Sequence, residues 1–285
     1  MNPAGQSSVS NVPAQMGQLP FLDREAETGR LRRAIDRRKS LLIVGPLGIG
    51  KTRLIAEVIK SLPRDRCESC IYLSAVTGLR GTLTRLLRNL YAAEDPTLRR
   101  QMRADGFRSS DFKAWLKAQP SAHLKGTLYR TVERRSYWIF LDQVSVMTPS
   151  VAKVIRELVR MRDTPVYLLT RSLKGRAADH LLNLYWSNEH RLSLAPLPET
   201  AARSLVESCI ESFALSHLDL STFRQEVLRV SSRIPGAIVQ MCALAAEQHY
   251  QSGLRVKTRL LHLDCLLKGY EKLPKPETGG ERLCP

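Results

Sequence analysis

One short glycine-rich stretch carries the residue types that bind phosphate. Gly45-Pro46-Leu47-Gly48-Ile49-Gly50-Lys51-Thr52 matches, at every fixed position, the spacing G-x-x-x-x-G-K followed by Ser or Thr. The glycines let the backbone curl so that its N–H groups face phosphate oxygens, and the helix expected next adds its positive N-terminal end. Lys51 would reach the β- and γ-phosphates, and the Thr52 hydroxyl would bind Mg²⁺. We therefore expect residues 45–52 to bind a nucleoside triphosphate with Mg²⁺.

A second group for Mg²⁺ is expected at the end of a neighbouring strand. Asp142 directly follows Tyr137-Trp138-Ile139-Phe140-Leu141, an apolar run typical of a buried strand. We predict that Asp142 is a Walker B aspartate, although aspartate is also a common helix N-cap. The next residue is Gln143, where many ATPases have a glutamate that polarises the attacking water. Because an amide does not accept a proton as a carboxylate does, we expect tight nucleotide binding and slow hydrolysis.

Strands and helices alternate along the first two thirds of the chain. Short apolar runs predict strands at residues 40–44, 71–73, 137–141, 166–169 and 191–194. Amphipathic patterns predict helices between them, at 23–39, 51–62, 79–91, 124–135 and 151–161, with short helices within 95–120. This alternation is typical of an α/β fold with a parallel, doubly wound sheet. After Pro198 the pattern is helical throughout, with helices predicted at 199–214, 219–232, 236–250 and 257–269.

Composition excludes several classes of protein. Hydrophobic residues make up 43% and charged residues 25% of the 285, so the chain is neither fibrous nor wholly disordered. The longest apolar run is Leu41-Leu42-Ile43-Val44, far too short to cross a bilayer, so we expect no membrane partner and a cytoplasmic protein. Cys67-Glu68-Ser69-Cys70 has the spacing of half a zinc site, but no second pair completes four ligands.

Charge is the feature that points to a large partner. Lys and Arg number 44 against 27 Asp and Glu, which gives a net charge of +17. Such a surplus favours a polyanion such as DNA, although a merely basic protein has the same composition. The chain contains no zinc-finger, homeodomain or aromatic RNA-binding signature. Any DNA binding is therefore expected to follow the phosphate backbone and to be sensitive to salt.

Several elements occurring together resemble a known family. They are Phe21-Leu22-Asp23-Arg24-Glu25-Ala26-Glu27, the loop at 45–52, the strand before Asp142, the strand ending in Thr170-Arg171, and Leu194-Ala195-Pro196-Leu197-Pro198 before a helix. Together they resemble AAA-type P-loop ATPases, the group that includes STAND signalling NTPases, origin-recognition ATPases and transposon helper ATPases. The resemblance covers roughly residues 21–270.

The resemblance implies roles for further residues. Thr170 and Arg171 would sense the γ-phosphate, although they are also consistent with an ordinary strand end. Pro235, in Arg233-Ile234-Pro235-Gly236, would contact the base from a lid helix, but the glycine that precedes this proline in STAND proteins is missing. A proline in the first turn of a helix explains the same pattern. No NKxD element that reads guanine is found, so ATP is expected.

Composition, the helical pattern and the resemblance together imply a domain organisation, since residues 1–20 are rich in Ser, Gln, Asn, Gly and Pro and the chain ends in PKPETGGERLCP. We expect a flexible leader at residues 1–20, an AAA-type ATPase core at 21–196, an all-helical lid domain at 197–270 and a flexible tail at 271–285. If the protein forms a homo-oligomer, Arg156, Arg160 and Arg162 would reach the nucleotide bound by a neighbouring copy. The expected function is an ATP-controlled switch or helper associated with DNA, with a signalling switch controlled by a protein partner as the alternative.

Overall fold

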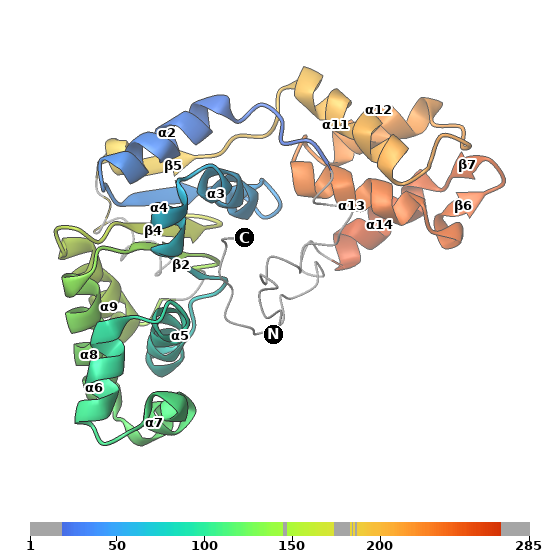
Figure 1. Ribbon diagram of the computed structural model, residues 1–285. Helices are drawn as coiled ribbons and strands as arrows, with labels where there is room; N and C mark the ends of the chain where they lie inside the picture. Colours follow the sequence, from blue (N-terminus) through green and yellow to red (C-terminus); the bar gives the residue numbers. More distant parts are fainter. Residues whose placement is uncertain (1–18, 145–146, 174–182, 184, 186, 269–285) are drawn as a thin grey trace.

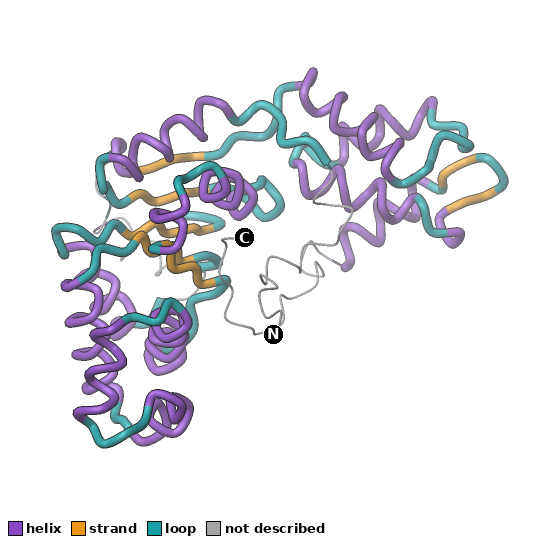
Figure 2. The backbone as a smooth tube through the Cα atoms, in the orientation of Figure 1, coloured by secondary structure: helices purple, strands orange, loops and turns teal. Residues whose placement is uncertain are grey.

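A five-stranded parallel sheet forms the centre of the part of the chain that precedes Pro198 (Figures 1 and 2). The computed structural model describes residues 19–144, 147–173, 183, 185 and 187–268. The strands are β1 (Leu41–Val44), β2 (Cys70–Leu73), β3 (Trp138–Leu141), β4 (Val166–Thr170) and β5 (Arg191–Ser193). They lie in the order β2-β3-β4-β1-β5, and every pairing is parallel. The expected α/β fold with a doubly wound sheet is therefore confirmed.

Both faces of this sheet are covered by helices. One face packs against α2 (Glu25–Asp36), α3 (Lys51–Lys60) and α4 (Arg64–Glu68). The other packs against α5 (Leu79–Ala92), α8 (Ser121–Arg134) and α9 (Pro149–Arg160), with α6 (Pro96–Ala104) and α7 (Phe112–Ala118) extending that layer. Successive residues of a strand face opposite sides of the sheet, and helices cover both sides. The strands are therefore apolar on both faces. In β4, Val166 and Leu168 join one apolar cluster, whereas Tyr167 and Leu169 join the other.

The C-terminal part is a helical unit with its own apolar core. Its helices are α11 (Glu199–Ser212), α12 (Ser221–Val230), α13 (Pro235–Ala245) and α14 (Thr258–Lys268). Figure 1 shows this unit beyond the α2 and β5 side of the sheet, away from α6 and α7. Leu19 is buried in the same core, so the start of the described chain packs against the C-terminal helices.

The secondary structure follows the expected pattern with one clear error. Every other predicted strand and long helix agrees with the structure within three residues at either end. The helix predicted over 236–250 is present, but its expected end is wrong, because α13 ends at Ala245. A hairpin of β6 (Gln251–Ser252) and β7 (Arg255–Val256) follows, so the part after Pro198 is not all helical as expected. Gly253, at φ 57°, supplies the left-handed backbone that this turn requires. The short helix α4 was not predicted.

Cys209, Cys242 and Cys265 are buried in the core of the helical unit. Within the described residues, no helix is both long and apolar enough to cross a membrane.

Candidate nucleotide-binding site

The glycine-rich loop joins the carboxyl end of β1 to the first turn of α3. Gly50 is the N-cap of α3 with φ 100°, a conformation that a side chain rarely permits. Its carbonyl accepts a 2.8 Å hydrogen bond from the N–H of Leu54, which starts the helix. Ile49 is buried in the apolar cluster below and anchors the loop to the sheet. The sequence therefore forms the strand–loop–helix turn in which backbone N–H groups can surround an anion.

Lys51 lies inside this loop. Its ammonium Nζ donates to the carbonyl oxygens of Gly45 at 2.6 Å and of Pro46 at 3.0 Å. The residue is only 9% exposed, and burial lowers the pKa of its ammonium to about 8, opposed by the nearby Asp142 carboxylate and assisted by the positive charge of Arg171. A cation held at this destabilised position gains more from a bound polyphosphate than a solvated lysine would.

Thr52 and Asp142 are in contact at the carboxyl ends of the strands. The Thr52 hydroxyl donates to Oδ2 of Asp142 at 2.5 Å, although the two residues are 90 positions apart. The hydroxyl of Tyr72, from β2, donates to the same oxygen at 2.7 Å, and the N–H of Gln143 donates to Oδ1 at 2.6 Å. The carboxylate therefore has a fixed orientation toward the start of α3.

These oxygens fit a divalent cation. Asp142 is 2% exposed, and burial raises the pKa of its carboxyl, against the opposing hydrogen bonds from Thr52, Tyr72 and Gln143 and the charge of Lys51. A carboxylate and a hydroxyl oxygen side by side are the hard donors that Mg²⁺ prefers. A cation there would favour the ionised carboxyl, which burial alone disfavours.

Gln143 lies next to this pair in an unusual backbone conformation. It has φ 47°, in the left-handed region, and its side chain is exposed. Non-glycine residues in this region cost on the order of 1 kcal/mol or more and are enriched at functional sites. The next residue, Val144, bonds to β4 through its N–H and the carbonyl of Leu169 at 3.0 Å. The strained residue is therefore held between two anchored neighbours, Asp142 and Val144.

Thr170 and Arg171 lie at the adjacent end of β4. Thr170 is buried, and its hydroxyl lies 3.1 Å from the carbonyl oxygens of both Val144 and Ser172. The Thr170 hydroxyl therefore links the end of β4 to Val144, in the segment that follows Asp142. Arg171 has an exposed side chain, close enough to Lys51 to lower the pKa of that lysine. Their proposed role in sensing the γ-phosphate stays a prediction.

The helical unit contacts the loop through the first residues of α13. Pro235 occupies the first turn of this helix, as the proline pattern allows. Gly236 donates its N–H to the carbonyl of Gly48 at 2.8 Å. A Cβ added to Gly236 would lie 2.7 Å from Cα of Gly48 and 2.9 Å from its carbonyl oxygen. The two backbones touch directly, so this position accommodates only glycine without displacement.

A cavity lies beside the loop, between the sheet and the helical unit. Its volume is about 500 Å³, and its walls come from residues 23–27, 195–198 and Arg233. The buried guanidinium of Arg24 joins two of these walls, since it donates to the carbonyl of Ala195 at 2.7 Å and to Glu27 at 2.8 Å. Arg233 and Ala195 are each next in sequence to a residue close to the loop glycines.

The structure brings together the loop, Lys51, Thr52, Asp142 and the end of β4. Pro235 lies one residue from the backbone contact with the loop. Three site residues were not singled out from the sequence, namely Tyr72, Gly236 and the guanidinium of Arg24. The signal for Tyr72 was a tyrosine within a buried apolar strand, because a buried hydroxyl needs a hydrogen-bond partner. The signal for Gly236 was a glycine directly after a proline that opens a helix, because glycine permits close approach of another backbone.

Comparison with known proteins identifies relatives of the first half of the chain. The family model described as AAA ATPase domain matches residues 20–170. No curated protein matches the chain.

Solved structures share the fold at low identity. A STAND protein with a tetratricopeptide repeat sensor from Pyrococcus horikoshii is 17% identical with a TM-score of 0.50, covering 88% of this chain and 33% of that one. Cdc6p from Pyrobaculum aerophilum is 10% identical with a TM-score of 0.51, covering 84% and 64%. A Walker-type ATPase of Pyrococcus abyssi is 13% identical with a TM-score of 0.50, covering 78% and 67%. The chain thus spans only a third of the length of the STAND protein, and these likenesses show the fold alone.

Replacing Lys51 with methionine should stabilise the protein in the absence of nucleotide. Below pH 8 the buried ammonium is charged in the folded and unfolded states, and the lowered pKa means that folding disfavours this charge. We expect Lys51→Met to raise the free energy of unfolding at pH 7 by about 1–3 kcal/mol. The gain should shrink as the pH rises from about 8 towards 10.5, because wild-type Lys51 then loses its proton in the folded state.

The matched control is Lys60→Met on the same helix. Lys60 is 52% exposed, so its removal should leave the unfolding free energy nearly unchanged at every pH. Urea denaturation at pH 7, 9 and 10 measures both variants. A Lys51→Met protein less stable than wild type at pH 7 contradicts the assignment of a destabilised ammonium.

Replacing Gly236 with alanine should separate α13 from the loop. The added methyl group meets backbone atoms of Gly48 rather than a movable side chain, so the contact must open. We expect ATP affinity to fall by roughly tenfold or more, which corresponds to about 1.4 kcal/mol. Isothermal titration measures the affinity. The control Gly126→Ala adds a methyl group in α8, where the nearest atom is a flexible arginine nitrogen at 3.6 Å, and should leave affinity unaltered.

Proposed function

The chain belongs to the AAA ATPase domain family, and from that premise we propose that it is an ATP-operated switch that hydrolyses ATP slowly and associates with DNA. The 2.5 Å contact of Thr52 with Asp142, beside the buried Lys51, carries the ATP-binding part of this proposal. Lys51 and the loop N–H groups would hold the phosphates. Thr52 and Asp142 would hold Mg²⁺, which neutralises charge on the phosphates when bound.

The cavity beside the loop is the proposed site of the base. At about 500 Å³ it lies in the range of small-molecule pockets. Its lining residues Ala195 and Arg233 are next in sequence to Leu194 and Ile234, which lie close to Gly45 and Gly48, so a nucleotide with its phosphates in the loop could extend its base towards the cavity. Adenine is favoured over guanine because the chain contains no NKxD element.

The contact between Gly236 and Gly48 supports the switch. A hydrogen bond of 2.8 Å links the phosphate-binding loop to the first turn of α13, and α13 is part of the core of the helical unit. A change in the loop when nucleotide binds would therefore act on the helical unit through backbone rather than through flexible side chains.

Slow hydrolysis is proposed from the residue after Asp142. Gln143 offers an amide where a carboxylate would accept a proton from water. Its exposed side chain and anchored backbone leave room for a replacement of the same length.

The DNA association is proposed from the net charge of +17.

A second candidate function is a signalling switch controlled by a protein partner. The fold likeness to a signal transduction ATPase with numerous domains favours it. In that case a protein partner, rather than DNA, would bind and control the switch. Turnover measured with and without duplex DNA separates the two candidates, since only the first expects DNA to alter the rate.

Binding and turnover test the proposed function directly. Wild type should bind ATP in the presence of Mg²⁺, and Lys51→Ala should lose this binding because the phosphates lose their buried cation. Equilibrium dialysis measures both. Retention of wild-type affinity by the variant would show that the loop is not the site.

Gln143→Glu should raise ATP turnover by roughly tenfold or more, because a carboxylate at this position supplies a general base. Single-turnover assays of phosphate release measure the effect, with ATP affinity as the control. An unchanged rate would mean that this amide does not limit hydrolysis.

A further inference from the structure

Positive charge is distributed unevenly between the two parts of the chain. Residues 79–135, which form α5 to α8, contain 13 Lys and Arg against 5 Asp and Glu, a net charge of +8. Residues 199–268, which form the helical unit, contain 8 against 7, a net charge of +1. Nearly half of the surplus of the whole chain therefore lies in one segment of 57 residues.

The arginines of the two parts also differ in their partners. In the helical unit three arginines pair with glutamates, Arg203 with Glu199 at 2.6 Å, Arg224 with Glu207 at 2.7 Å and Arg229 with Glu226 at 2.5 Å. On α6 and α8, by contrast, Arg100, Arg103 and Arg134 are exposed and have no acidic partner among the described residues.

Two of the five acids of this segment, Glu94 and Asp95, already have hydrogen-bond or ion-pair partners. Asp95 is fully buried, caps α6 through the N–H groups of Thr97 and Leu98, and accepts a hydrogen bond from Tyr137 at 2.5 Å. Glu94 pairs with Arg99 at 3.0 Å. Arg100, Arg103 and Arg134 therefore have no ion pair among the described residues, with Glu133 on α8 the exposed acid beside them.

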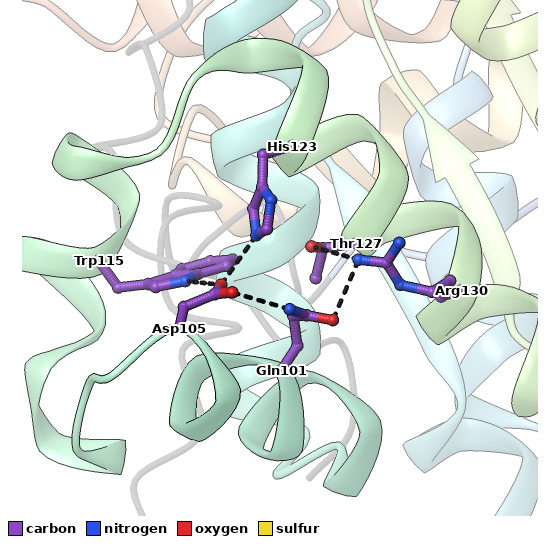
Figure 3. Close-up of polar contacts among 6 residues, drawn as sticks. All are labelled: Gln101, Asp105, Trp115, His123, Thr127 and Arg130. Atoms are coloured by element: carbon purple, nitrogen blue, oxygen red, sulfur yellow. Dashed lines mark hydrogen bonds and ion pairs between the residues drawn. The ribbon is translucent and has the colours of Figure 1, made fainter.

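A polar network holds the helices of this surface in fixed positions. The guanidinium of Arg130, on α8, donates to Gln101 on α6 at 3.0 Å (Figure 3). Gln101 in turn donates to Asp105 at 2.9 Å, and Asp105 also bonds Trp115 of α7 and His123 of α8, each at 2.8 Å. One carboxylate thus links three helices.

Four exposed arginines lie on α6 and α8 beside this network. Arg100 is adjacent to Gln101, Arg103 lies one turn further along α6, and Arg134 lies one turn beyond Arg130 on α8. We call Arg100, Arg103, Arg130 and Arg134 the α6–α8 arginine face. Figure 1 shows α6 and α8 on the far side of the sheet from α11 to α14.

We propose that the α6–α8 arginine face binds the phosphate backbone of duplex DNA. The proposal rests on the DNA association proposed above and assigns the surface that makes it. Guanidinium groups bind phosphate strongly, and the polar network fixes the helices from which these side chains extend. The exposed large hydrophobic residues of the described chain are Leu254 and Leu263, both in the helical unit. The face therefore lacks the aromatic platforms that single strands stack on and the apolar groups that insert into membranes.

The test removes three unpaired charges and measures the salt dependence of binding. In the variant Arg100→Gln, Arg103→Gln, Arg134→Gln, the slope of log affinity for a 20-base-pair duplex against log salt should fall by about 2–3, since each phosphate contact contributes about 0.9. Affinity at 0.1 M salt should fall roughly a hundredfold. ATP affinity should stay at the wild-type value, because the face is remote from the loop.

The matched control removes three paired arginines of the helical unit, Arg203→Gln, Arg224→Gln and Arg229→Gln. It lowers the net charge by the same amount and should leave the slope almost unaltered. Equal loss in both triple variants would overturn the proposed face, since net charge alone would then explain binding. Restoration of the slope by the corresponding three lysine substitutions supports a backbone contact.

Wild type that fails to bind duplex at 50 mM salt, with ATP binding intact, refutes the DNA association itself and the face with it. Wild type that binds, together with an α6–α8 variant that binds equally well, refutes only the face. The thermal unfolding of each variant shows whether a loss reflects misfolding.

Discussion

The parallel alignment of β1, β3 and β4 is the constraint on which the candidate site depends. Val44 pairs with Thr170, and Leu141 pairs with Leu168, so the carboxyl ends of these strands lie at one edge of the sheet. The loop after β1 and Asp142 after β3 are thereby brought within hydrogen-bond distance. In an antiparallel arrangement the same two segments would lie at opposite edges. The chemistry of the site therefore follows from the direction of the strands.

The site concentrates features that disfavour folding. The Lys51 ammonium and the Asp142 carboxyl group are both buried at this site, and burial shifts the pKa of each towards its neutral form. Gln143 has positive φ, and so do Ser232 and Arg233, in the loop that leads into α13. The surrounding apolar clusters make these arrangements possible, because they fix the strands and helices from which the strained residues project.

The two parts of the chain handle charge in different ways. In the helical unit, Arg203, Arg224 and Arg229 pair with glutamates on the same or neighbouring helices. The helices after β2 instead use their carboxylates internally, as caps and as links between helices, and leave arginines facing solvent. The first pattern leaves the helical unit with a net charge of only +1. The second suits a surface that meets an anionic partner.

The sequence by itself determined the loop, its strand and its helix, because glycine freedom, apolar runs and helical periodicity are local properties. It also located Asp142, since an acid ending an apolar strand is a local pattern as well. Only the tertiary structure decided that Tyr72 holds the Asp142 carboxylate and that Gly236 touches Gly48, because both contacts join segments distant in the chain. Whether an arginine is paired likewise depends on which helices become neighbours. The short hairpin after α13 was missed because strands of two residues carry no periodicity, and only the turn at Gly253 marks the place.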